Sequence, residues 1–262
     1  MKMTMSKDTL RQAINVVVII VTLAVNGLAN AIPFNGQTTA EISDRFHVFF
    51  VPAGYVFAIW GVIYLGLIAF AIYQALPSQR DNPRLRQVGY LFAIANLANA
   101  IWLFFWHYNL FVLSLLTMLI LLGLLIAIYL ILDIGRSDVS LSERLTVHLP
   151  VSIYLGWISV ATIANFTDVL YDIDWDGFGI APQSWAVIML AVALLLGTAM
   201  ALIRRDVAFL LVFVWAFAGI GVKQSAAQMV SISAWVAAFL SFLLAILAVV
   251  NKPKKSKSSA AL

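Results

Sequence analysis

The sequence contains no cysteine and few charged residues: only 11% of its 262 residues are Asp, Glu, Lys or Arg. The absence of cysteine excludes disulfide bonds, thiol catalysis and cysteine-ligated metal centres. The scarcity of charge excludes an ordinary soluble surface, because soluble domains carry about 25% charged residues. Apolar residues make up 63% of the chain instead. A soluble fold could not cover so much apolar surface, so we expect the chain to lie in a lipid bilayer.

Eight apolar stretches approach the length of roughly 20 residues that crosses the hydrocarbon core of a bilayer. They are residues 12–33, 53–76, 87–107, 110–132, 147–167, 184–203, 206–223 and 226–250. The bilayer core cannot satisfy a free backbone, and no period-2 alternation marks membrane strands, so these stretches should be helices. The fold class predicted is therefore all-α: a polytopic transmembrane helical bundle of about eight spans.

Basic residues alternate between abundance and near absence in the segments that separate these spans. They concentrate at both termini and in every second connection, whereas Arg45 and Lys223 are isolated on the other side. Because Lys and Arg concentrate on the cytoplasmic side, both the N- and C-termini are predicted to be cytoplasmic. The location expected is the bacterial cytoplasmic membrane. The basic residues do not gather on one face, so no nucleic-acid partner is expected.

The two ends of the chain allow specific interpretations. The first span could be a cleaved signal peptide, with Ala29-Asn30-Ala31 as the cleavage site. Asn26 and Asn30 interrupt its apolar stretch, however, which favours a retained, packed helix. The Lys/Ser-rich tail, residues 251–262, is predicted to be disordered.

Ionisable residues are absent from the middle of every predicted span, which argues against a conventional proton-driven pump. The three histidines form no metal-binding pattern. His47 and His107 fall on the outer side, where we expect solvated or interfacial side chains, and His148 begins the fifth span on the inner side. No metal site is therefore predicted.

The outer connection at 168–183 is acidic. Asp172, Asp174 and Asp176, followed by Gly177, resemble the start of a calcium-binding loop. The twelfth position is Gln183 rather than the bidentate Glu that closes such a site. A solvated acidic loop is therefore the expected structure.

Aromatic and amide side chains recur at helical spacing on the second, third and fifth spans. Trp60 and Trp157 lie well inside their spans, so the interfacial aromatic belt explains them poorly. Buried amides often act only as packing contacts between membrane helices. Together with the tryptophans, however, amides such as Asn99 favour an aromatic-lined cavity for a flat apolar ligand.

At these positions the sequence resembles the tryptophan-rich sensory protein family, also called the translocator protein or TspO/MBR family. The patterns that carry the resemblance are Pro52-Ala-Gly-Tyr55-Val-Phe57-Ala-Ile-Trp60-Gly-Val-Ile-Tyr64, Asn99-Ala-Ile-Trp102 and Tyr154-Leu-Gly-Trp157-Ile-Ser-Val-Ala161-Thr-Ile-Ala-Asn165. Two features depart from the family. Ile153 replaces its Pro before the fifth-helix Tyr, and acidic residues follow Tyr171 where the family has a basic one. The second difference argues against sterol binding by that segment.

The resemblance implies a five-helix core at 1–170, with 171–250 as a three-helix membrane extension. It implies a sensor that binds a hydrophobic planar ligand such as a porphyrin, with no required cofactor but with a tetrapyrrole as a candidate bound group. The implied ligand-binding residues are Tyr55, Phe57, Trp60, Asn99, Trp102, Tyr154, Trp157 and Asn165. The lipid bilayer and a hydrophobic small molecule are the expected partners, and a homodimer is compatible with the pattern.

Two other function classes stay open at this stage. Eight helices leave room for a path, so the chain could instead be a transporter of a hydrophobic or neutral solute. Some family members are associated with light-dependent porphyrin breakdown, which would make the chain an enzyme. The sequence offers no nucleophile–base pair and no metal centre, and this argues against other catalysis.

Overall fold

The computed structural model describes residues 6–251, and this part of the chain is helical without any strand. The basic tail that the sequence predicts to be disordered lies, apart from Asn251, outside the described residues. The long helices are α1 (Lys7–Ala31), α3 (Ile59–Ala75), α5 (Leu91–His107), α6 (Phe111–Ile131), α8 (Leu149–Asp172), α9 (Pro182–Ala199), α10 (Val207–Lys223) and α11 (Gln228–Val250). They correspond to the eight predicted spans, so the all-α bundle is confirmed.

Short elements connect or extend the long helices. These are η1 (Phe34–Gly36), α2 (Thr39–Asp44), η2 (Gly54–Ala58), η3 (Pro77–Gln79), α4 (Pro83–Val88), α7 (Leu141–Glu143), the π-helix η4 (Arg144–His148), η5 (Gly177–Gly179) and the π-helix η6 (Met200–Arg204). Counting these extensions, six segments of the described chain are long and apolar enough to cross a membrane. The helices α5 and α10 have 17 residues each, or about 26 Å, slightly less than a hydrocarbon core of about 30 Å.

Several predicted span boundaries differ from the observed helix ends; the first span, for example, was expected from residue 12, but α1 begins at Lys7. The third span was expected to begin at residue 87, but Gly89 adopts φ +56° and separates α4 from α5. The fifth was expected to end at residue 167, but α8 continues to Asp172. Asp168 therefore lies in a membrane helix and not in the acidic outer loop.

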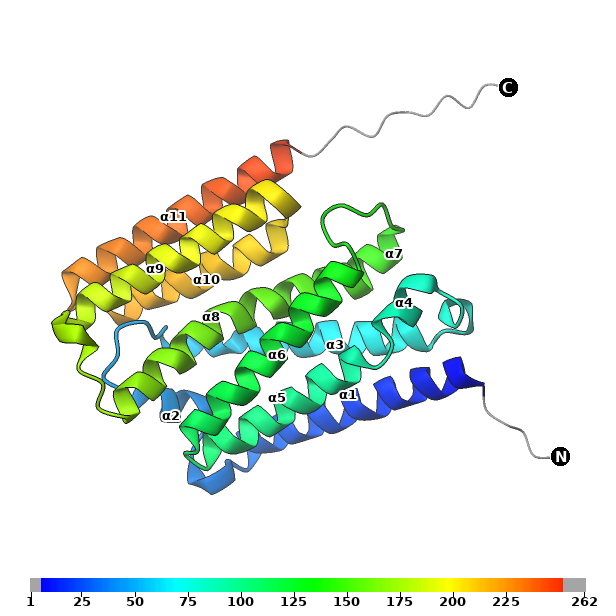
Figure 1. Cartoon of the computed structure of the whole chain (residues 1–262), viewed down its shortest axis with the longest axis horizontal. Coiled ribbons are helices and arrows are strands. Elements are labelled where there is room, and N and C mark those ends of the chain that lie inside the picture. Colours follow the sequence, from blue (N-terminus) through cyan, green and yellow to red (C-terminus); the bar gives the residue numbers. More distant parts are fainter. Residues whose placement is uncertain (1–5, 252–262) are drawn as a thin grey trace.

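Five helices form a closed circle, which we call the ring. Helix α1 packs against α3 and α5, α6 packs against α5 and α8, and α3 packs against α8. The remaining helices, α9, α10 and α11, pack on one another and form the extension, which contacts the ring mainly through α10 and α8 (Figure 1). Because both groups cover α8, 72% of the most apolar window of α7–α8 is buried, against 28–44% in the other five spans.

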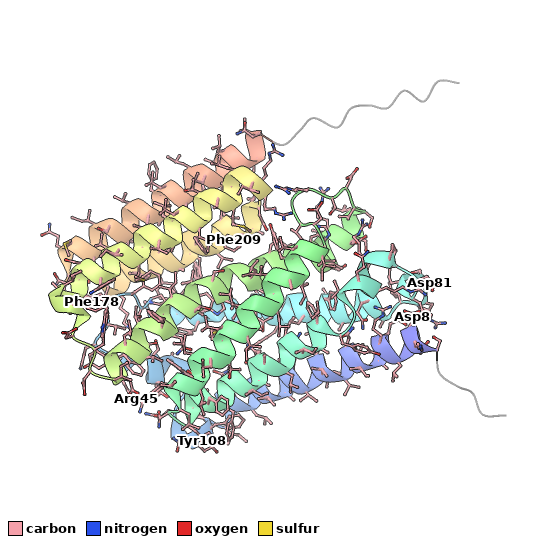
Figure 2. All side chains as sticks on the ribbon, viewed as in Figure 1. Asp8, Arg45, Asp81, Tyr108, Phe178 and Phe209 are labelled. Carbon is pink, nitrogen blue, oxygen red and sulfur yellow. The ribbon has the colours of Figure 1, made fainter. Side chains whose placement is uncertain are left out.

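The two ends of the bundle carry different connections. The start of α1 and the end of α11 lie at the same end, together with α4 and α7, whereas α2 lies at the opposite end (Figure 1). Asp8 and Asp81 mark the first end, and Arg45, Tyr108 and Phe178 mark the other (Figure 2). Eight helices that cross the bilayer in alternate directions must begin and end on the same side. We call the end with the termini the inner end, following the cytoplasmic location predicted from the basic residues.

Asp206 is a buried polar link between ring and extension near the inner end. Its side chain is 6% exposed and precedes α10, where Oδ1 accepts the N–H of Phe209 at 3.1 Å. Its Oδ2 accepts hydrogen bonds from the hydroxyls of Tyr129 (2.8 Å) and Ser152 (2.6 Å). One carboxylate thereby caps α10 and ties it to α6 and α8.

Candidate functional site

Trp60 of α3 lies inside the ring and is surrounded by aromatic side chains. Its ring stacks on Trp102 of α5 (centroids 6.2 Å apart, interplanar angle 26°) and on Tyr64 (5.7 Å, 24°). It meets two α8 rings edge to face, Tyr154 at 6.1 Å and Trp157 at 6.3 Å. Offset-stacked and edge-to-face pairs are the favourable geometries for aromatic side chains. Aromatic residues predicted from three separate spans thus form one cluster.

A chain of polar contacts closes the inner side of this cluster. The hydroxyl of Tyr64 donates to Oδ1 of Asn26 at 2.8 Å, and Nδ2 of Asn26 donates to Oδ1 of Asn99 at 2.9 Å. Asn99 is 1% exposed and Tyr154 is 1% exposed. The Tyr154 hydroxyl also interacts with the Asn99 side chain, so the polar layer reaches α8. Asn26 belongs to this layer although the implied ligand-binding set did not include it.

Asn165 of α8 orients the side chain of Trp102. Its Oδ1 accepts the indole N–H of Trp102 at 3.4 Å, and its Nδ2 donates to Ser114 at 3.1 Å. Phe57 completes the cluster by meeting the ring of Trp157 edge to face at 5.8 Å. Of the eight implied ligand-binding residues, the structure therefore brings seven together in one cluster, with Trp60 at its centre.

Tyr55 is the exception. Its side chain is 50% exposed, and its ring packs against Trp215 of α10 at 5.5 Å. It precedes Trp60 by five residues, a spacing that puts two side chains on different faces of a helix. The structure therefore places Tyr55 at the contact with the extension, outside the aromatic cluster.

A narrow cleft follows one face of α8 from the aromatic cluster to the outer end. Its volume is about 40 Å³, which holds water molecules but no larger ligand. The lining positions on α8 span 11 residues, or about 16 Å along the helix axis. The side chains that line the cleft are Thr39, Ser43, Pro52, Phe57, Trp60, Trp102, Trp106, Trp157, Val160, Ala161, Ala164, Asn165 and Asp168.

Two cleft residues carry buried polar atoms that have no hydrogen-bond partner in the described part of the chain. One is the indole N–H of Trp157, and the other is Oδ1 of Asp168, whose residue is 1% exposed. A buried, unpaired carboxylate is costly, so its presence in a membrane helix indicates a function. The sequence interpretation missed Asp168 because the predicted span ended one residue earlier. Extending the helical face of Asn165 by three residues would have found it.

Residues 39–56, which we call the roof, cover the outer end of the cleft. Its helix α2 begins with a capping box in which the Thr38 backbone N–H donates to Glu41 at 2.7 Å. That backbone hydrogen bond, reinforced by the Thr38 hydroxyl, lowers the pKa of Glu41. The cap therefore stabilises α2 above the ordinary pKa of Glu and is lost as the pH falls through the lowered folded value. Trp106 holds α2 to the ring by donating to the Thr39 carbonyl at 3.3 Å.

The extension holds the other half of the roof. The carbonyl of Gly219 on α10 accepts the N–H of Ala53 at 3.1 Å, and Trp215 donates to the Val56 carbonyl at 3.0 Å. A Cβ atom at Gly219 would lie 2.2 Å from Cγ2 of Val56, so this close approach requires glycine. At the end of α10, Lys223 forms an ion pair with Asp44.

A larger pocket of about 540 Å³ lies at the outer end, between α8, α9 and the chain after α2. Its walls are mostly apolar and include Phe49, Phe166, Trp175, Phe178 and Trp185. No pattern identified in the sequence indicates this pocket.

The histidines and the acidic loop form no metal centre. His107 is buried, not interfacial as expected, and its Nδ1 lies 2.8 Å from the Leu103 carbonyl. His47 is exposed and meets the ring of Tyr171 edge to face. Within residues 6–251, no group of three or more His, Cys, Asp or Glu side chains could hold a metal ion.

Comparison with known proteins gives one family. A family model described as "TSPO-like protein" matches residues 12–248. No curated protein and no solved structure matches the chain. The matched range includes α9, α10 and α11 as well as the ring, so it covers nearly all of the chain that the structure describes. With its apolar helices, this match shows an integral, multi-pass membrane protein that belongs to the TSPO-like family.

Proposed function

We propose that this protein is a binding protein and sensor for a hydrophobic planar ligand, embedded in the bacterial cytoplasmic membrane. The observation that carries the proposal is the cluster around Trp60, in which aromatic rings from three helices adjoin a cleft with unpartnered polar atoms. Aromatic walls suit a flat apolar body, and a few polar atoms orient it. A tetrapyrrole such as protoporphyrin is the ligand that the resemblance suggests.

The small volume of the cleft means that a ligand enters only when the cleft widens. Ligand pockets for drug-sized molecules have volumes of about 300–1,000 Å³, far above the 40 Å³ present here. The roof is the segment that must move, because it covers the cleft through α2 and Pro52. It is held by individual hydrogen bonds and one ion pair, and these can break separately.

The inner half of the ring supports binding rather than transport. Tyr64, Asn26 and Asn99 form a continuous hydrogen-bonded layer below Trp60. A transporter would need this layer to open as well as the roof. A ligand that enters from the outer end would instead stop against the layer, as expected of a sensor.

Ligand titration of the purified protein tests this proposal. We expect protoporphyrin or the smaller planar molecule 1-methylnaphthalene to quench tryptophan fluorescence saturably, beyond a detergent blank. Replacing Trp157→Phe removes part of the cleft wall and should weaken binding about tenfold. The matched control is Trp235→Phe, at a residue of α11 that is 48% exposed, and it should leave the affinity unchanged.

Two outcomes would contradict the proposal. Absence of saturable quenching by both molecules would exclude a planar-ligand site, and equal effects of the two tryptophan variants would place binding elsewhere. Proteoliposomes separate sensing from transport, because a sensor binds the molecule without moving it across the bilayer.

A further inference from the structure

We propose that the ligand carries a protonated amine and that the carboxylate of Asp168 binds this amine at the outer end of the cleft. The inference rests on the proposed function, because it assigns the charge of the ligand that the aromatic cluster holds. Asp168 lies on the same face of α8 as Asn165 and Trp157, and it lines the cleft with them. The planar body would therefore lie against the tryptophans while the amine reaches the carboxylate.

The first argument is the missing partner of Asp168. A carboxyl group that is 1% exposed stays ionised only beside a positive charge or several hydrogen-bond donors, and without them it binds a proton. Of the described residues, none that lines the cleft is Lys, Arg or His. Lys223 stands near the outer end, but its ammonium group pairs with Asp44 of the roof. Lys223 therefore acts on Asp168 only through its charge at a distance, and none of the described cations contacts the carboxyl group, which leaves a place for a ligand amine.

The second argument is the surroundings of the carboxylate. Trp106 lines the cleft and stacks on Trp102 at 6.0 Å, so tryptophan faces continue toward the outer end. Aromatic faces are negative and attract cations, most strongly when water is excluded. The hydroxyl side chains of Thr39 and Ser43 also line the cleft and add acceptors for the remaining N–H groups of an ammonium ion.

The same arrangement disfavours an anion. A ligand carboxylate placed beside Asp168 would repel it in surroundings of low dielectric constant. A porphyrin would therefore bind only with its carboxylates directed away from this end. The cleft would thus distinguish planar ligands by the charge of the group that lies beside Asp168.

Three molecules that share a naphthalene body and differ in charge test the inference in wild-type protein. They are 1-naphthylmethylamine, 1-methylnaphthalene and 1-naphthoic acid, measured by titration calorimetry at neutral pH. We expect the amine to bind at least about tenfold more tightly than the neutral molecule, and the acid to bind most weakly.

Two variants locate the effect. Asp168→Asn should remove the preference for the amine and leave 1-methylnaphthalene within about threefold of its wild-type affinity. Asp172→Asn makes the same charge change one turn later, at an exposed residue, and should leave the ranking intact.

The outcomes are distinct. If the neutral molecule binds wild-type protein but the amine binds no more tightly, the inference is wrong and the proposed function stands. If Asp172→Asn abolishes the preference as fully as Asp168→Asn, the preference arises from general surface charge and the inference is wrong. If none of the three molecules binds, the proposed function fails and the inference fails with it.

Discussion

The ring and the extension bury different kinds of side chain. The ring buries amides, hydroxyls, carboxyl groups and tryptophans, several of which have polar atoms without partners. In the extension, among the residues up to Asn251, only Asp206 and Ser241 are buried polar side chains. Its helices instead approach through small residues such as Ala193, Ala234 and Gly197. Both regions lie in the same bilayer, so the solvent does not explain the difference.

The difference indicates that the ring carries the candidate binding site and that the extension supports it by packing. Lipid is as apolar as leucine, so membrane helices associate through close packing, which small residues permit, and through hydrogen bonds. The extension uses mainly close packing, which gives it a compact face against α8. The ring holds most of the unpartnered polar atoms, and two of them, on Trp157 and Asp168, lie in the cleft, where a ligand would supply the partner. Besides the packing of α10 on α8 and the ion pair of Arg204 with Asp133, an inner contact at Asp206 and an outer contact at the roof connect the regions, and each can be broken separately.

Breaking the inner contact should have the largest effect on stability. Asp206→Ala removes the cap of α10 and leaves the buried hydroxyls of Tyr129 and Ser152 without their acceptor. We expect the free energy of unfolding to fall by about 3 kcal/mol, measured by denaturant titration in detergent. The preference for 1-naphthylmethylamine should survive, because Asp206 lies far from the outer end.

Asp133→Ala is the control for that experiment. Asp133 pairs with Arg204 at 2.7 Å, and because Arg204 is only 12% exposed and Asp133 adopts φ +48°, the substitution should cost about 1–2 kcal/mol, still less than Asp206→Ala. A loss of ligand preference in Asp206→Ala, with the protein still folded, would show that the inner contact shapes the site and that the extension does more than support it.

Breaking the outer contact should change binding more than stability. In Gly219→Ala the new Cβ overlaps Val56 and must push the roof away from α10. We expect about 1–2 kcal/mol of destabilisation and roughly tenfold weaker binding of 1-methylnaphthalene. Gly61→Ala is the matched variant in the ring, because no atom lies within 4 Å of its new Cβ. If both variants bind normally, the extension does not position the roof.

Much of the fold could be predicted because the length and the apolar composition of a segment identify a membrane helix. Each predicted span corresponds to a helix, including the short α10. The pairing of the helices could not be predicted, since apolar side chains on α9 and α11 carry no information about which neighbour they meet. The contact between Gly219 and the roof joins residues more than 160 positions apart, and no local pattern indicates it.

The site was predictable where helical spacing determines it. Trp60 and Tyr64, four residues apart, were expected on one face and stack there. Tyr55 was included because of a motif and not because of its face, and the 3-10 turn that contains it leads outward to Trp215. Asp168 was missed for a physical reason: hydropathy places the end of a span before a charge, whereas the helix continues and buries it.

The smallest predicted effect concerns the ion pair between Lys223 and Asp44, which joins extension and roof. Their side chains are 26% and 54% exposed, so the coupling in a double-mutant cycle of Lys223→Gln and Asp44→Asn should be below about 1 kcal/mol. The pair should matter more for kinetics, because a looser roof opens more often. We expect each single variant to raise the dissociation rate of 1-naphthylmethylamine about threefold, measured by stopped-flow fluorescence. An unchanged rate would mean that the hydrogen bonds of Trp106, Trp215 and Gly219 hold the roof without the ion pair, and the extension would then act on the site through close packing and not through charge.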